Sequence, residues 1–257
     1  MHGHLFEFCR HILILKADRL WLAALRHAAT VAFPAASVAF THCVAGARTA
    51  LARRRYDLLI SGLLLPDGDV LDLLAGNALT PPPAAPRQLV VTGQRLPHML
   101  AALRARGVAG AFDTRAEQPE AIASVVTRVG RGGRYWSKDL AAHAGVDSAR
   151  PPPLHRLLTP VEELVLATIG DGSSDRAGAG HLGVEPSTIH GVRRELYRKL
   201  GVHDCPGLAR AAQQAGYVRI TPAGVIRPGY AHLFAACRGR KMGRGRSRLK
   251  SHPFAPD

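Results

Sequence analysis

Short apolar runs alternate with longer amphipathic stretches over the first 130 residues. The runs are unbroken, as in strands buried on both faces, and lie at 11–15, 37–40, 58–61, 89–92 and 110–112. Between them, apolar positions recur with helical spacing at 19–31, 44–55, 69–77, 97–106 and 118–129. Five strand–helix units predict an α/β fold, a doubly wound parallel sheet of flavodoxin type, with function at the carboxyl ends of the strands.

A second region, from about residue 157, is patterned for helices alone. Thr159 suits an N-cap, Pro160 the first helical position, and Glu162 completes a capping box. Further helices are expected at 175–182, 186–200 and 206–215, since apolar residues recur there at spacings of three and four. The pattern predicts a small all-α domain.

Two stretches without sustained periodicity divide the chain. Residues 138–156 contain the proline triplet 151–153 and are expected to form a linker, and after residue 219 Gly, Pro, Arg and Lys dominate. The expected organisation is therefore an α/β domain at 1–137, a linker at 138–156, a helical domain at 157–219 and a basic, disordered tail at 220–257.

The helix expected at 186–200 has two unlike faces. Apolar residues at 189, 192, 196 and 200 point to a core, and polar ones line the opposite side: His190, Arg193, Arg194, Tyr197 and Arg198. A helix, a short turn and a helix with a basic, donor-rich face fit the major groove of DNA. The pattern also suits an amphipathic helix with a merely solvated basic side.

The net charge of the chain indicates a polyanionic partner, and the distribution of charge along the chain limits which residues can recognise that partner specifically. The formal net charge is +15, which favours phosphate-rich partners. Residues 1–137 carry 16 basic and 9 acidic side chains, residues 154–219 carry 8 and 7, and residues 220–257 carry 8 and 1. Specific recognition by the helical domain must therefore come from a few placed residues, while the tail either adds nonspecific phosphate contacts or is simply solvated.

Several classes of function are disfavoured. Basic residues at 10, 16, 19 and 26 interrupt the N-terminal apolar stretch, which also lacks the character of a signal peptide, so we expect a cytoplasmic protein without a membrane anchor. Four widely separated cysteines form no Cys-x-x-Cys pair, so neither metal nor disulfide is expected. No nucleophile–base pair or phosphate loop has useful spacing, so we expect neither an enzyme nor a cofactor.

The segments 56–69, 89–93 and 107–112 resemble the receiver domain of two-component response regulators. That resemblance places the phosphoacceptor position at Gly62, the magnesium-binding acidic pair at Lys16 and Ala17, the phosphoryl-contacting lysine at Thr114, and the switch threonine at Thr92. Glycine has no nucleophile and a lysine repels Mg²⁺. The sequence therefore predicts a pseudo-receiver that is not phosphorylated.

Some chemistry at this predicted edge stays open. Asp18, Asp67 and Asp69 form either an acidic pocket or a polar turn with a helix start, and a register shift of one residue would place Ser61 at the phosphoacceptor position. Lys16 either meets an anion or pairs with Asp18 or solvent. Some receivers of this kind respond to a small molecule, so the resemblance also implies a small-molecule or protein ligand in place of phosphate.

The segments 158–166, 181–184, 187–189 and 196–202 resemble the LuxR-type helix-turn-helix of NarL-like response regulators. The resemblance implies binding to double-stranded DNA and assigns base edges to His190, Gly191 and Arg194. It assigns phosphates to the remaining polar positions: Ser187, Thr188, Arg193, Arg198 and Lys199. Family members form homodimers through the helix corresponding to 206–215, whose apolar stripe can alternatively cap the domain core.

Two glycines depart from the family pattern in the helix at 175–182. Gly178 stands where relatives carry isoleucine, and Gly180 where they carry another small residue. Each interior glycine costs about 1 kcal/mol relative to alanine, and a lost buried isoleucine costs about 1.5–3 kcal/mol. The expected function is a DNA-binding transcriptional regulator, and the rival is an interaction module whose helix-turn-helix no longer reads DNA.

Overall fold

The computed structural model describes residues 9–75, 85–146, 154–221 and 224–238. The chain forms two compact units, Met1–Arg95 with Met99–Asp147, and Leu96–His98 with Ser148–Asp257. No helix in the described ranges is long and apolar enough to cross a membrane.

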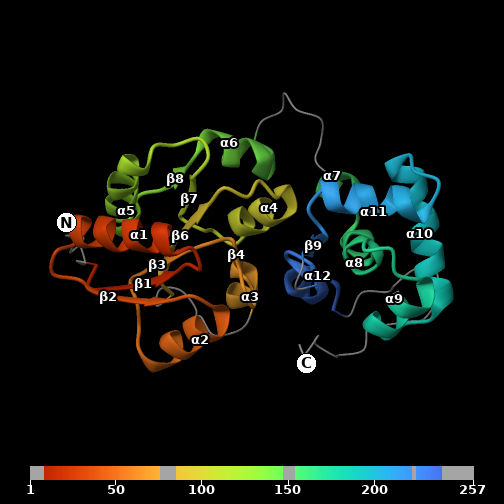
Figure 1. Ribbon diagram of the computed structural model, residues 1–257, viewed down its shortest axis with the longest axis horizontal. Coiled ribbons are helices and arrows are strands. Elements are labelled where there is room, and N and C mark those ends of the chain that lie inside the picture. Colours follow the sequence, from red (N-terminus) through yellow and green to blue (C-terminus); the bar gives the residue numbers. More distant parts are fainter. Residues whose placement is uncertain (1–8, 76–84, 147–153, 222–223, 239–257) are drawn as a thin grey trace, which may run out of the picture. The chain divides into compact units, whose positions relative to one another are not determined.

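The first unit is built on a six-stranded, all-parallel sheet in the order β2-β1-β3-β6-β7-β8 (Figure 1). The strands are β1 (His11–Leu15), β2 (Ser37–Thr41), β3 (Leu58–Ser61), β6 (Arg87–Thr92), β7 (Gly110–Asp113) and β8 (Tyr135–Trp136). The five predicted strands and the doubly wound α/β architecture are confirmed. The sequence did not predict β8, because two residues are too few to show a period.

Helices cover both faces of this sheet: α1 (Arg19–Ala32), α2 (Val44–Arg53), α3 (Val70–Ala75), α4 (Pro97–Ala105) and α5 (Ile122–Gly130). A short antiparallel hairpin, β4 (Leu64–Leu65) and β5 (Gly68–Asp69), leads into α3, and a 3-10 turn at Pro119–Ala121 leads into α5. Successive residues of β1 face opposite sides. Ile12 and Ile14 pack with α1 and α5, whereas Leu13 and Leu15 pack with α2 and α3.

The start of the predicted linker belongs to the first unit. Helix α6 (Lys138–Ala141) continues into a wider helical turn at Ala142–Val146, and Leu140 and Ala144 are buried. The prediction of a linker from residue 138 was therefore wrong at its N-terminal end, because two buried apolar residues and the Arg95–Asp139 ion pair hold this segment without a sustained apolar period. Its C-terminal end forms the short helix α7 (Leu154–Leu157), and the proline triplet lies outside the described residues.

The second unit contains the four predicted helices, α8 (Pro160–Ile169), α9 (Asp175–Leu182), α10 (Pro186–Leu200) and α11 (Cys205–Gln214). The predicted capping box is present at α8: the Thr159 N–H donates to Glu162 Oε2 at 2.7 Å, and the Glu162 N–H donates to Thr159 Oγ1 at 3.3 Å. Gly183 ends α9 and Gly201 ends α10, both with left-handed backbone at φ +64°. The stop at Gly183 sets the short turn between α9 and α10.

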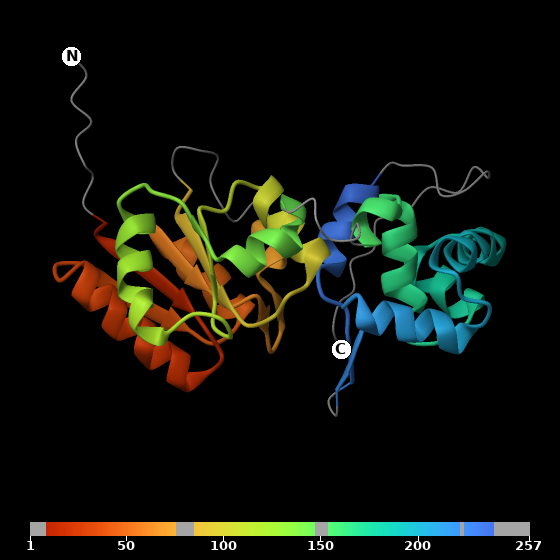
Figure 2. The same ribbon diagram turned by 90° about the horizontal axis from the view of Figure 1, so that it is seen from above.

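The prediction of disorder from residue 220 was wrong for residues 220–221 and 224–238. Strands β9 (Arg219–Thr221) and β10 (Gly224–Ile226) form a hairpin, and α12 (Tyr230–Cys237) lies beside α8 (Figures 1 and 2). Leu233, Phe234 and Cys237 are buried in the core that α8 also supplies. Glycine, proline and arginine around this stripe hid it from the sequence pattern. The basic run from 239 onward lies outside the described residues.

A half-buried cation, Arg227, fastens this extension to α8. The Arg227 guanidinium pairs with Asp171 at 2.7 Å and donates from Nε to the Ala167 carbonyl at 3.0 Å. Burial raises the pKa of Asp171, but the hydrogen bonds from Ser173 and the charge of Arg227 outweigh burial and hold this pKa below its ordinary value. The carbonyls that end α8 thus receive donors from the chain beyond residue 219.

Candidate functional site

The carboxyl edge of the sheet brings together the positions that the receiver resemblance singles out. The Gly62 N–H, directly after β3, donates to the Leu15 carbonyl at 2.8 Å, and the Thr114 N–H donates to the carbonyl of Thr92 at 3.1 Å. Lys16 follows β1 at the same edge. Ser61 is the last residue of β3 and is buried.

Lys16 occupies the space beside Gly62. A Cβ atom added to Gly62 would lie 3.7 Å from the Lys16 Nζ atom and 3.5 Å from its Cδ atom. The ammonium group donates a hydrogen bond to the Val91 carbonyl at 2.9 Å. Burial lowers the pKa of Lys16, and the negative charge of Asp18 partly opposes that shift. The lysine is thus drawn inward across β3 to a backbone acceptor on β6.

The acidic residues near this edge begin helices. Asp18 accepts the Trp21 N–H at 3.0 Å and caps α1. Asp67 accepts from the backbone N–H groups of Val44 and Ala45, at 2.7 and 2.9 Å, and so caps α2 from another segment. Asp69 accepts the N–H of Leu71 at 2.8 Å, where α3 starts. Across the described ranges, His, Cys, Asp and Glu side chains form no group suited to a metal ion. These contacts favour the interpretation of Asp67 and Asp69 as a polar turn and helix start.

Sequence reasoning missed a buried carboxylate at this edge. Asp113, at the end of β7, is fully buried and accepts from Arg95 Nε at 3.0 Å and Nη2 at 2.9 Å. Arg95 also pairs with Asp139 at 2.8 Å, which ties α6 to the strand ends. An acidic residue directly after a buried strand was the available signal, and the distant arginine could not be read from spacing.

Helix α10 presents an exposed polar stripe in the second unit. Ile189, Val192 and Leu196 are buried, which confirms the predicted apolar face. The stripe consists of exposed residues at spacings of three and four, namely Ser187, His190, Gly191, Arg194 and Arg198. Thr188 is half-buried at its edge. A Cβ atom on Gly191 would have no neighbour within 4 Å, so this stripe is open.

Arg193 does not belong to that stripe, and its predicted exposure was wrong. The residue is 6% exposed. Its Nε atom pairs with Asp175 at 2.6 Å, Nη2 donates to the Ser173 carbonyl at 2.8 Å, and Nη1 lies 2.9 Å from the Cys205 sulfur. The fold engages all three guanidinium nitrogens, so Arg193 holds α9 and the start of α11 against α10.

Lys199 is also held by the protein. Its ammonium pairs with Glu162 at 2.7 Å and donates to the Leu157 carbonyl at 3.2 Å. Burial raises the pKa of Glu162, but the hydrogen bonds from Lys199 and Thr159 outweigh burial and keep this pKa below its ordinary value. The lysine predicted near phosphates therefore completes the capping box of α8.

The remaining donors on the stripe differ in how far they are engaged. Arg194 forms no ion pair within the described part of the chain. Arg198 pairs with Glu195 at 3.0 Å, but both side chains are more than half exposed, and such pairs exchange readily with solvent. His190 Nδ1 lies 3.2 Å from Asp175 Oδ2. Arg194 is thus the cation on this stripe most available to a partner.

The two glycines of α9 have opposite surroundings. A Cβ atom on Gly178 would lie 2.5 Å from Cγ2 of Ile169, whereas one on Gly180 would have no neighbour within 4 Å. The expectation that a missing isoleucine at 178 costs buried area was wrong in its reasoning, because Ile169 of α8 fills that space. Gly178 permits a close helix–helix approach.

The apolar stripe of α11 faces inward. Leu208 and Ala212 are buried in the core of the second unit, whereas Pro206, Arg210 and Gln213 are exposed. The apolar stripe of this helix therefore caps the domain core, and pairing of two chains through α11 stays a prediction.

Comparisons with known proteins agree with this architecture. No protein-family model matches the chain. The chain is 36% identical over 104 residues to the transcriptional regulatory protein UhpA of Escherichia coli, covering 40% of this chain and 50% of that protein. It is 28% identical over 156 residues to UhpA of Salmonella typhimurium, covering 61% and 74%. The chain thus spans half the length of the first of these relatives.

Solved structures with a similar fold include the response regulator RcsB. RcsB from Salmonella enterica serovar Typhimurium bound to promoter P1flhDC superposes with a TM-score of 0.54 at 18% identity, over 79% of this chain and 97% of that one. Another Salmonella RcsB structure gives a TM-score of 0.54 at 18% identity, over 80% and 98%. The fold is therefore a flavodoxin-like receiver followed by a helical domain, and the curated relatives support a resemblance to NarL/LuxR-type response regulators.

Proposed function

We propose that this protein is a cytoplasmic DNA-binding transcriptional regulator with the architecture of a NarL/LuxR-type response regulator. The observation that carries the proposal is the open stripe on α10, where Arg194 projects from a helix that follows α9 through a short turn. Such a helix fits the major groove, and an arginine reads guanine through two parallel hydrogen bonds. The curated relatives, which are transcriptional regulatory proteins, support the same function.

Within this proposal the stripe divides its tasks by position. His190, Gly191 and Arg194 face base edges, and Ser187, Thr188 and Arg198 lie near phosphates. Arg193 and Lys199 act indirectly, by fixing α10 against its neighbours through Asp175 and Glu162. Gly191 adds no contact of its own and lets the backbone approach a base closely.

We further propose that the receiver-like unit is not phosphorylated. Gly62 offers no carboxylate, and the Lys16 ammonium lies where a divalent cation would have to approach. A small molecule or a protein bound to this unit then supplies the signal.

Two copies of the chain pair through the exposed side of α11, which would set two recognition helices about one DNA turn apart.

A DNA footprinting series against upstream regions of the gene neighbourhood tests the regulator. Replacing Arg194 with alanine is expected to weaken specific binding by about 1–3 kcal/mol, roughly 5- to 150-fold. Arg53→Ala removes the same charge from an exposed site on α2 and serves as the matched control. Equal losses in both variants, or uniform salt-labile binding to unrelated sequences, would exclude specific reading by α10.

One observation favours the rival function, an interaction module that does not read DNA. The fold sequesters two of the four cations at 193–199, so the free positive charge on α10 is small. Under that function no protected site appears, and Arg194→Ala leaves every DNA affinity unchanged.

Incubation with acetyl phosphate and magnesium tests the receiver separately: we expect no adduct, and labelling at residue 18, 61 or 62 would contradict the proposal.

A further inference from the structure

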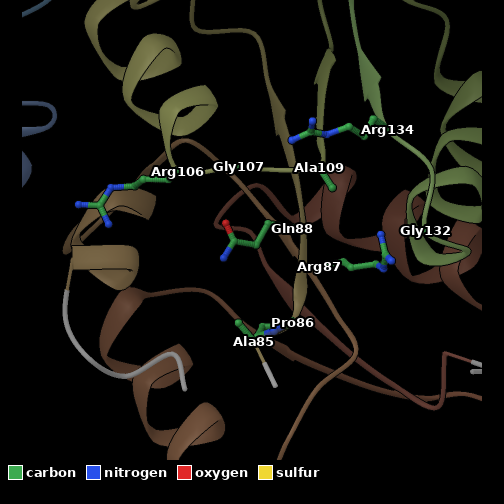
Figure 3. A pocket seen from close by; sticks show the side chains of 9 residues that line it. All are labelled: Ala85, Pro86, Arg87, Gln88, Arg106, Gly107, Ala109, Gly132 and Arg134. Carbon is green, nitrogen blue, oxygen red and sulfur yellow. The ribbon is translucent and has the colours of Figure 1, made fainter. Parts of the chain in front are cut away.

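A cavity of about 380 Å³ opens in the first unit at the edge of the sheet opposite to Lys16 and Gly62 (Figure 3). It lies at the amino ends of β6 and β7, where Arg87 begins β6 and Gly107 follows α4. The turn after α5 closes another side through Gly132. Nothing in the proposed DNA-binding function uses this cavity.

Arginine side chains line this cavity. Arg87, Arg106 and Arg134 line it from three different segments, with the Arg106 guanidinium pointing away from the other two (Figure 3). No acidic side chain stands among its described lining residues. Arg106 donates from Nη1 to the Leu74 carbonyl at 2.8 Å. Arg87 and Arg134 have no side-chain ion pair or hydrogen bond within the described residues. The charges of Arg87 and Arg134 beside one hollow repel each other, and a bound anion would relieve that repulsion.

Two glycines, Gly107 and Gly132, add no side chain to the cavity, and Gly132 leaves space for the Arg87 guanidinium. Gly132 has φ +99°, and a Cβ atom there would lie 3.0 Å from the Arg87 Nη2 atom. The bare backbone therefore lets the Arg87 guanidinium lie against the turn. Gly107, with φ +75°, likewise places no side chain in the opening. Pro86 and Ala109 are buried and provide an apolar floor, and the Gln88 amide supplies both a donor and an acceptor.

We propose that this cavity binds a small phosphomonoester no larger than a mononucleotide. Guanidinium forks match the geometry of phosphate oxygens and bind them through paired hydrogen bonds. The volume falls in the usual range for small-molecule sites, which are largely apolar with a few placed polar groups. The apolar floor and Gln88 suit the uncharged part of such a ligand. A concave site of this size accommodates a terminal phosphate better than the continuous backbone of a duplex.

Isothermal titration calorimetry of the full chain with adenosine 5′-monophosphate and with inorganic phosphate tests this site. We expect saturable one-to-one binding of at least one of the two. The double variant Arg87→Gln, Arg134→Gln is expected to weaken it at least tenfold. Arg131→Gln removes an exposed charge from the same turn without lining the cavity, and it should change affinity less than twofold. Absence of saturable binding, or equal weakening by Arg131→Gln, would overturn the proposal.

Two further measurements separate geometry from bulk charge. Replacing Arg87 and Arg134 with lysine keeps the charge but removes the bidentate fork, so binding should still fall several-fold; full retention would contradict a shaped phosphate site. On the unaltered chain, phenylglyoxal modification of Arg87 and Arg134 should slow in the presence of adenosine 5′-monophosphate, while modification of Arg131 should not. A 20-base-pair DNA duplex that protects these arginines when the mononucleotide does not would overturn the proposal in favour of a nucleic-acid surface.

Discussion

The carboxyl edge of the sheet and the outer stripe of α10 were both predicted as functional, and they treat their polar side chains in opposite ways. At the sheet edge the protein supplies the partners: Lys16 bonds to the Val91 carbonyl, and Asp113 is enclosed by Arg95. On α10, Arg194 and Gly191 face open space. A conspicuous cation therefore marks a binding surface only where the fold has not already provided its anion or acceptor.

The same contrast recurs between neighbouring residues. Arg193 is buried and triply engaged, whereas Arg194, one residue further, is exposed. In α9, a Cβ atom added to Gly178 would meet Ile169, whereas one added to Gly180 would meet nothing within 4 Å. Packed and open positions can thus be compared within one helix, with residue type held constant.

The largest expected effect separates Arg193 from Arg194. Arg193→Ala removes the arginine that pairs with the half-buried Asp175 and should destabilise the second unit by about 2–4 kcal/mol, since Asp175 and the Ser173 carbonyl both lose its donors. Arg194→Ala should change stability by less than about 0.5 kcal/mol. Hydrogen exchange of peptides from α9 and α10 measures both changes. Both tryptophans, Trp21 and Trp136, lie in the first unit, so their fluorescence checks that this unit is unaffected. Equal protection from hydrogen exchange in Arg193→Ala and Arg194→Ala would contradict the different roles of these two arginines.

The glycine pair of α9 gives the next largest effect. Gly178→Ala forces a methyl group against Ile169 and should cost about 1–3 kcal/mol. Gly180→Ala adds a methyl group in open space and should stabilise the helix by up to about 1 kcal/mol. Circular dichroism during urea unfolding reports both. Stabilisation by Gly178→Ala would mean that α8 and α9 approach less closely than described.

Lys16 provides a smaller, pH-dependent test. Because burial lowers its pKa, the folded chain releases this proton at a lower pH than the unfolded chain does. Stability therefore rises with pH between the lowered pKa and the ordinary value of 10.5. Lys16→Met should remove that rise and change stability at pH 7 by about 1 kcal/mol or less. The measurement is the urea unfolding midpoint of the unaltered chain and of Lys16→Met, followed by tryptophan fluorescence at pH 7 and 10. An equal change of midpoint with pH in the two proteins would contradict the buried position of Lys16.

The smallest expected effect comes from restoring an acid at the sheet edge. In Gly62→Asp the new carboxylate should pair with the Lys16 ammonium, because the Cβ position lies 3.7 Å from Nζ. Acetyl phosphate with magnesium should still leave no adduct, as intact-mass spectrometry would show. Phosphorylation at residue 62 would show that the lysine can yield to a magnesium ion.

The spacing of apolar residues predicted the helices and strands that bury several residues on one face. It did not predict the elements that pack through only a few residues. The strands from β1 to β7 in the main sheet and the helices from α8 to α11 have four or more residues in register, whereas β8 has two and α12 lies among glycine, proline and arginine. Arg193 could have been found: it stands four residues after Ile189 and three before Leu196, on the buried stripe. Its partner Asp175, and the contact of Gly178 with Ile169, depend on how two helices approach, which spacing within one helix does not encode.

The contacts of Arg227 and α12 with α8 determine where a fragment that contains the second unit can end. A fragment ended at residue 219, where the helix-turn-helix pattern stops, would lose Leu233, Phe234 and Cys237 from the core and leave the carbonyls at the end of α8 without their donor. Such a fragment would expose an apolar face on α8 and would tend to aggregate. An excised second unit of this protein should therefore extend through residue 238.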